Sequence, residues 1–265
     1  MMRLRTYDEM DMIYQERHKQ GLSGASYVLR YESNGQKLFF FGSRHSADPD
    51  DNEWKILEKE WQEFISASNK YKHVFCEGHL RPVNALSKQQ SIIKHAETGL
   101  ICWLADKYNI PISSPEPDRA EEIDYLTEQG FTFEQIITFY FARQMLQWLS
   151  YDHSANPDWQ AYAANTLQRY QTAHSWGGLR LELDKVLAMY KNQTGKEFSD
   201  QDKKQLYALS HPAQNPVTSA SGQLRDIRLF NAIKENWMKG YDVFIVYGSG
   251  HAIVLEPALE ELVKA

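Results

Sequence analysis

Residues 38–45 read Leu-Phe-Phe-Phe-Gly-Ser-Arg-His, and residues 243–251 read Val-Phe-Ile-Val-Tyr-Gly-Ser-Gly-His. Each stretch is a short apolar run, typical of a buried strand, that ends in Gly-x-x-His. In an α/β sheet the carboxyl ends of parallel strands form the ligand-binding edge. We therefore expect His45 and His251 to lie at one edge of a sheet, where Gly42 and Gly248 let the chain turn sharply. Two unrelated turn histidines are the alternative.

Three further apolar runs complete the predicted sheet, whose strands cover residues 26–31, 37–41, 73–76, 110–113 and 241–247. An Asn-Gly pair at 34–35 predicts an antiparallel hairpin between the first two strands. Apolar residues three and four apart at 53–69 and 89–108 predict helices that cross between parallel strands. The expected fold class is therefore α/β, a central mixed β-sheet flanked by helices.

The middle of the chain shows helical periodicity without strand signals. Helices are predicted at residues 119–128, 133–149, 157–172, 178–191, 199–209 and 224–238. The segment 211–222 is rich in Pro, Ser and Gly, which predicts a loop, either a flap or a linker. We expect a single domain over residues 1–265, in which 22–117 and 223–265 form the α/β core and 118–222 is a large helical insertion.

Composition excludes several classes of protein. The chain has 265 residues, of which 42% are hydrophobic, so it can bury a sizeable core and is neither fibrous nor disordered. Its 29 Lys and Arg against 35 Asp and Glu give a net charge of −6, which argues against nucleic acid as a partner. The chain has only two cysteines, and it shows neither a secretory signal nor an apolar run long enough to span a membrane. These features predict a cytoplasmic protein without a membrane partner.

Two glutamates follow predicted strands at the same edge. Glu77 comes directly after the strand at 73–76, and Glu116 follows the strand at 110–113. If the first strand continued through His79, Glu77 and His79 would share one face and could form a metal-binding or proton-transfer pair. Ordinary loop residues are the alternative for all three.

A third acid, Glu97, falls on the apolar stripe of the predicted helix 89–108, together with Ile93 and Leu100. A carboxylate there needs a cation, a metal or a hydrogen-bond network, because unpaired burial is costly. Glu97 would form an internal salt bridge or take a direct catalytic role. Arg44 in the first motif and Arg225, which is followed by Asp226, could clamp a carboxylate, a phosphate or a developing oxyanion.

Taken together, these motifs resemble the superfamily that joins the TraB/PrgY/GumN proteins, the TIKI metalloproteases, the erythromycin esterases and the ChaN-like proteins. The resemblance rests on the two Gly-x-x-His motifs, on Glu77 and on the Arg-Asp pair at 225–226, and it covers roughly residues 26–119 and 223–262. It implies an erythromycin-esterase/ChaN-like fold with an active cleft built from both motifs and the glutamate. In TIKI-like members that cleft looks metal-dependent and cleaves peptides; in the esterases a histidine is thought to activate water.

The function expected from the sequence is hydrolysis of an ester or peptide bond in a small-molecule or peptide substrate. His45, Glu77 and His251 would hold a divalent metal, Zn or Mn, or would orient a water directly. Without a metal, His45 would be the general base, and Arg44 or Arg225 would stabilise the oxyanion. The alternative is a non-enzymatic protein of ChaN-like type that binds haem or another small ligand; a secreted effector is a third interpretation, which no motif supports.

Overall fold

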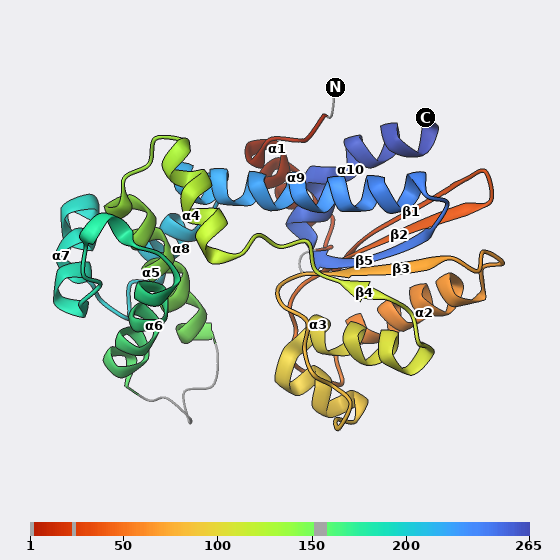
Figure 1. Cartoon of the computed structure of the whole chain (residues 1–265), viewed down its shortest axis with the longest axis horizontal. Helices are drawn as coiled ribbons and strands as arrows, with labels where there is room; N and C mark the ends of the chain where they lie inside the picture. Colours follow the sequence, from red (N-terminus) through yellow and green to blue (C-terminus); the bar gives the residue numbers. More distant parts are fainter. Residues whose placement is uncertain (1–2, 23–24, 151–157) are drawn as a thin grey trace. The chain divides into compact units, whose positions relative to one another are not determined.

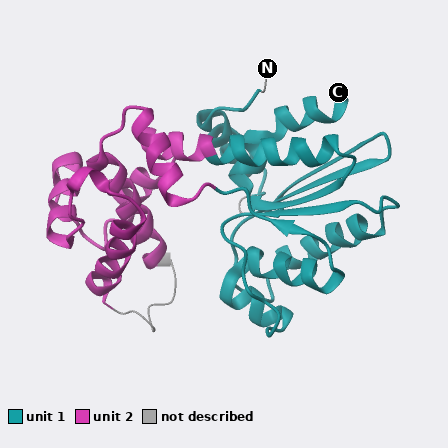
Figure 2. Cartoon of the chain, in the orientation of Figure 1, with its two compact units in different colours: residues 1–116, 225–265 teal, residues 117–224 magenta. Residues whose placement is uncertain are grey.

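The structure is a computed structural model that describes residues 3–22, 25–150 and 158–265. The chain divides into two compact units, one formed by residues 1–116 and 225–265 and the other by residues 117–224 (Figure 2). The first unit contains the sheet, and the second is built from helices. The expected insertion, residues 118–222, falls within the second unit; that the whole chain behaves as a single domain stays a prediction.

A five-stranded mixed sheet lies at the centre of the first unit, with the strand order β1-β2-β5-β3-β4 (Figure 1). The strands are β1 (Tyr27–Ser33), β2 (Gln36–Ser43), β3 (Lys72–Cys76), β4 (Ile112–Ser113) and β5 (Asp242–Gly248). β1 runs antiparallel to β2, and the other neighbours are parallel. The predicted α/β class, the mixed sheet and the positions of all five strands are therefore confirmed.

The β1–β2 hairpin turns where the sequence predicts it. Asn34 and Gly35 both have positive φ angles, 52° and 78°, as a tight two-residue hairpin turn requires. Asparagine and glycine are the residues that adopt this conformation at least cost, so the local sequence determines the turn.

The two Gly-x-x-His motifs lie on neighbouring parallel strands. β2 pairs with β5 from Leu38 opposite Val243 to Ser43 opposite Gly248, so both strands end at the same level. β3 lies on the other side of β5, where the N–H of Glu77 donates to the carbonyl of Val246 at 3.0 Å. Three strand ends from distant parts of the sequence thus meet at one edge, as predicted.

Helices cover both faces of the sheet (Figure 1). On one face Phe39 and Phe41 of β2 join a buried cluster with residues of α2 (Asn52–Ser66) and α3 (Lys88–Tyr108). On the other face Leu38 and Phe40 join residues of α9 (Pro216–Met238) and α10 (Ser249–Lys264). Because successive side chains of a strand point to opposite faces, one uninterrupted apolar run serves both layers.

Helix α3 is broken by a kink that the sequence analysis missed. Ala96 has φ 48° and ψ −134°, which no helix contains, and the chain reverses so tightly that a Cβ on Gly99 would lie 2.0 Å from the carbonyl oxygen of Ser91. Projection of 89–108 as one regular helix is therefore wrong for its first half: Ile93, expected on the buried stripe, is 58% exposed. Glu97, after the kink, is buried as expected.

The first and last helices, α1 (Tyr7–Lys19) and α10, are not among the predicted elements. The start of α1 carries a signal that could have been used, since Thr6 and Glu9 form a capping box. The phenol of Tyr14 and the hydroxyl of Ser249 lie 2.6 Å apart and join α1 to the first residue of α10. This contact places α1 beside the start of α10, directly after the end of β5.

The second unit contains α4, α5, α6, α7 and α8 and the first residues of α9. Their bounds are Arg119–Glu128, Phe133–Ser150, Trp159–Ala173, Leu183–Thr194 and Lys203–Ser210. Residue 157, where one predicted helix begins, lies outside the described residues. The prediction of a loop over 211–222 is wrong from Pro216 onward, where helix α9 begins. Proline is compatible with the first turn of a helix, and the side chain of Asn215 accepts hydrogen bonds from the backbone N–H groups of Val217 and Thr218. Of the helices described, none combines the length and the apolar character needed to cross a membrane.

Candidate active site

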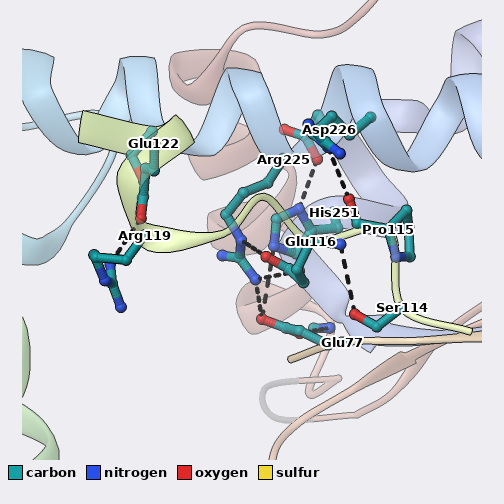
Figure 3. Close-up of polar contacts among 12 residues, drawn as sticks. Glu77, Ser114, Pro115, Glu116, Arg119, Glu122, Arg225, Asp226 and His251 are labelled. Atoms are coloured by element: carbon teal, nitrogen blue, oxygen red, sulfur yellow. Dashed lines mark hydrogen bonds and ion pairs between the residues drawn. The ribbon is translucent and has the colours of Figure 1, made fainter. Parts of the chain in front are cut away.

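Glu77 is the centre of a polar cluster at the edge where β2, β3 and β5 end. Arg225 donates from Nη2 to Oε1 of Glu77 at 2.6 Å (Figure 3). The N–H of Gly248 donates to Oε2 of Glu77 at 2.6 Å. The hydroxyl of Thr98 donates to the carbonyl oxygen of Glu77 at 3.0 Å. The side chain of Glu77 is only 16% exposed, so Glu77 is a fixed and almost buried carboxylate.

Arg225 lies between two carboxylates. Its Nε and Nη2 donate to the two oxygens of Glu116 at 2.7 and 2.9 Å, and the same Nη2 reaches Glu77 (Figure 3). Burial raises the pKa of both carboxyls, but the positive charge of Arg225 outweighs it and holds each pKa below its ordinary value. Glu77 therefore stays ionised and acts as a fixed negative charge rather than as a proton donor.

His251 faces Glu77 from the first turn of α10. Its Nδ1 lies 2.6 Å from Oδ1 of Asp226, and its Nε2 lies 3.8 Å from Oε1 of Glu77. Asp226 is fully buried, and its Oδ2 accepts a hydrogen bond from the hydroxyl of Tyr7 at 2.9 Å. Helix α9 thus supplies two consecutive residues with different roles, since Arg225 fixes Glu77 and Asp226 orients His251.

His45 faces Glu77 from the loop after β2. Its Nδ1 lies 2.6 Å from Oε1 of Glu97, and its Nε2 lies 4.0 Å from Oε2 of Glu77. Partial burial lowers the pKa of His45, but the hydrogen bond with Glu97 and the charge of Glu77 outweigh it and raise the pKa to about 9. The raised pKa favours the charged form of this imidazole at neutral pH, and the side chain is 51% exposed to solvent.

The two histidines have the same arrangement around Glu77. Each has its Nδ1 beside a carboxylate, which favours the proton on Nδ1, and each turns its Nε2 toward a different oxygen of Glu77. The separations of 4.0 and 3.8 Å are too long for a direct hydrogen bond, whereas one water about 2.8 Å from each atom could bridge either gap. This geometry can hold a water and move a proton to or from Nε2.

Glycine is required where β5 ends. A Cβ on Gly248 would lie 2.8 Å from Nε2 of His45 and 3.3 Å from Oε2 of Glu77, so a side chain there would fill the space between these two groups. Gly42, at the end of β2, is also tightly enclosed, with 2.8 Å between its hypothetical Cβ and the Cα of Ser249. Both glycines of the paired motifs therefore permit close approach of neighbouring protein groups, and neither has a positive φ, so the sharp turn expected of them does not depend on glycine's left-handed conformation.

Two of the predicted site residues lie outside the cluster. The guanidinium of Arg44 is 2.5 Å from Asp51, and the side chain does not contact Glu77. His79 is exposed, because β3 ends at Cys76 and Gly78 turns the chain with a φ of 70°. The condition for a pair on one strand face, that the strand continue through His79, is not met.

A metal ion could be held by His45, Glu77 and Glu97, whose ligand atoms all lie within 4.8 Å of one another. This set differs from the predicted one, because His251 faces the other oxygen of Glu77 on the side of Arg225. Oε2 of Glu97 is buried and has no hydrogen-bond partner among the described residues, which leaves it able to bind an ion. One nitrogen and two carboxylate ligands suit Zn or Mn.

Tyr7, which donates from α1 to Asp226, is not among the predicted site residues, because no helix is predicted there. Glu97, Glu116 and Asp226 are predicted from the sequence, but their partners are not. Their roles depend on contacts between residues 25 to 109 positions apart in the chain.

Comparison of the chain with protein-family models, with curated proteins and with solved structures finds no match. The superfamily resemblance therefore rests on the motifs alone and stays a prediction.

Proposed function

We propose that this protein is a hydrolase that cleaves an ester or peptide bond with a water activated at the cluster of His45, Glu77 and His251. The observation that carries the proposal is the arrangement of two imidazoles, each oriented by a carboxylate at 2.6 Å, around one ionised glutamate. Oriented His–carboxylate pairs are the groups that general acid–base catalysis requires. With the two motifs, they support a place in the TraB–TIKI–erythromycin esterase–ChaN superfamily.

In the proposed reaction His251 is the general base. Its Nε2 takes a proton from the water as the water oxygen attacks the carbonyl carbon, and Asp226 stabilises the imidazolium that forms. Glu77 accepts a hydrogen bond from the water and fixes its position. Arg225 keeps Glu77 ionised through this step, so it is a positioning residue rather than the oxyanion ligand expected from the sequence.

His45 is the acid of the proposed reaction. Its charged imidazole donates a hydrogen bond to the carbonyl oxygen as negative charge develops there, and its proton then passes to the leaving group when the bond to the carbonyl carbon breaks. The raised pKa of about 9 favours this acid role over the base role that the sequence suggested, because a histidine that is protonated at pH 7 is a poor base.

The pH dependence of hydrolysis tests these roles. On a panel of small esters and peptides, kcat/KM is expected to fall above about pH 9, as His45 loses its proton. Activity that rises through pH 9 to a plateau would instead make His45 the base. His45→Gln and His251→Asn should each lower kcat/KM by about 100-fold or more, whereas the exposed His79→Asn is the matched control and should leave it unchanged.

Two other possibilities for the same site have direct tests. If the purified protein holds Zn or Mn, the ion would bind His45, Glu77 and Glu97 and would lower the pKa of its bound water; metal analysis and the loss of activity with a chelator decide this. The haem-binding alternative predicts a Soret shift when haem is added, and an unchanged spectrum removes it.

A further inference from the structure

A basic cavity lies beside the candidate active site. It has a volume of about 480 Å³, within the range of small-molecule sites, and is formed by α1, the residues after it and the ends of β2 and β5. Its lining includes Arg17, Lys19 and Arg44, and none of the described residues that line it is acidic. Such a lining is unexpected in a chain whose net charge is −6, because chance would place acids there as often as bases.

The cations of this cavity are not equally available to a ligand. Asp51 lies 2.5 Å from the guanidinium of Arg44, and Glu16 lies 3.8 Å from the ammonium of Lys19. No carboxylate lies within ion-pair distance of Arg17 among the described residues. Arg17 is therefore the cation whose charge is least neutralised.

Arg17 is also held in place. Its Nη2 donates to the carbonyl oxygens of Ala25 and Ser26 at 3.1 and 3.2 Å, and its guanidinium lies 4.9 Å from the centre of the Tyr27 ring. These contacts use one end of the guanidinium and leave other N–H groups for a ligand. A fixed fork of donors without a neutralising acid is suited to a carboxylate or a phosphate group.

Two residues of the lining place this cavity next to the proposed chemistry. Arg44 directly precedes His45, and Ser249 directly follows Gly248, whose N–H donates to Glu77. The hydroxyls of Ser249 and Tyr14 lie 2.6 Å apart in the same lining and add polar groups beside the cations.

We propose that this cavity binds an oxyanion group, a phosphate or a carboxylate, and that the substrate of the site is a small molecule that carries such a group. Arg17 is the main ligand of the anion, and Lys19 and Arg44 add long-range attraction. The substrate assignment rests on the proposed hydrolase function, whereas binding of an anion to the cavity can be measured without any reaction.

The test is a titration of the full chain with inorganic phosphate, and in a second arm with acetate, at constant ionic strength in chloride, followed by calorimetry. Either anion is expected to bind more tightly than chloride, and the tighter one identifies the group. Arg17→Gln should weaken binding at least 10-fold, and Arg17→Lys, which keeps the charge without the fork, should weaken it less. The control is Lys55→Gln, in a second basic cavity that also contains Glu60, and it should bind as the unmodified protein does.

The outcomes separate this proposal from the proposed function. His251→Asn should lose hydrolysis and keep the anion affinity. If neither anion binds better than chloride, or if Arg17→Gln and Lys55→Gln weaken binding equally, the cavity proposal is overturned whatever the activity. If the anion binds as expected but no ester or peptide is hydrolysed, the hydrolase function fails and the cavity remains an anion site. Thermal unfolding of each variant checks that it is folded.

Discussion

Replacing Arg225 with methionine removes the guanidinium that lies between the carboxylates of Glu77 and Glu116. Three charge-assisted hydrogen bonds of 2.6–2.9 Å disappear, and two side chains that are only 16% and 11% exposed keep their negative charges without a partner. Bonds of this kind contribute about 1.5–3 kcal/mol each, so their sum would be about 5–9 kcal/mol.

Protonation of the carboxyls limits that loss. A glutamate with an ordinary pKa near 4.3 takes up a proton at pH 7 at a cost of about 3.7 kcal/mol, and at pH 5 the cost is only about 1 kcal/mol. A proton on one of the two carboxyls removes the repulsion between them, so we expect Arg225→Met to lower the free energy of unfolding by about 3–5 kcal/mol at pH 7 and by about 1–2 kcal/mol at pH 5.

The contribution of these two carboxyls to the pH dependence of stability should have opposite signs in the two proteins. In the native protein the pKa of Glu77 and of Glu116 is lowered, so their contribution is complete above the ordinary glutamate pKa and is lost as the pH falls below it. In the variant, burial without Arg225 raises both pKa values, so stability should increase as the pH falls from 8 to 5.

Urea unfolding followed by circular dichroism at pH 5, 7 and 8 measures these differences. Lys239→Met is the matched control, because it breaks an exposed ion pair with Glu235 and should change stability little at any pH. A loss for Arg225→Met that is the same at pH 5 and pH 8, or smaller than about 1 kcal/mol at pH 7, would refute the reasoning.

Three further substitutions test separate parts of the site. Gly248→Ala places a Cβ 2.8 Å from Nε2 of His45 and should lower kcat/KM at least 10-fold; an unchanged rate would show that this space is not used. Tyr7→Phe removes the hydroxyl that Asp226 accepts, and we expect a loss of about 1 kcal/mol in urea unfolding together with a lower kcat. Ala96→Gly should raise stability by about 1 kcal/mol, because φ 48° and ψ −134° are unfavourable for alanine; a decrease would mean that the kink is not strained.

The periodicity of apolar residues was sufficient to predict an element of secondary structure where one local pattern dominates. The apolar runs before Gly42 and Gly248 are short, rich in aromatic and β-branched residues and end in glycine, so they predict strands that end together. Helices on both faces are typical of parallel strands, but the pairing of β2 with β5 is seen only in the structure.

Periodicity failed where the backbone departs from a regular element. A projection of 89–108 assumes a constant 100° per residue, and the turn at Ala96 resets it, which moves Ile93 to the surface. The predicted loop at 211–222 failed for the opposite reason, since its proline lies at the first turn of α9, where proline is compatible with a helix.

The sequence by itself determined the strands, the glycine ends and the residue types of the site, because these depend on neighbours a few positions apart. Only the tertiary structure decided which carboxylate serves which group: Glu97 orients His45, Asp226 orients His251, and Glu116 shares Arg225 with Glu77. The physical reason is that a hydrogen bond acts over about 3 Å, and the distances between these groups are set by the packing of α3, α9 and α10 against the sheet.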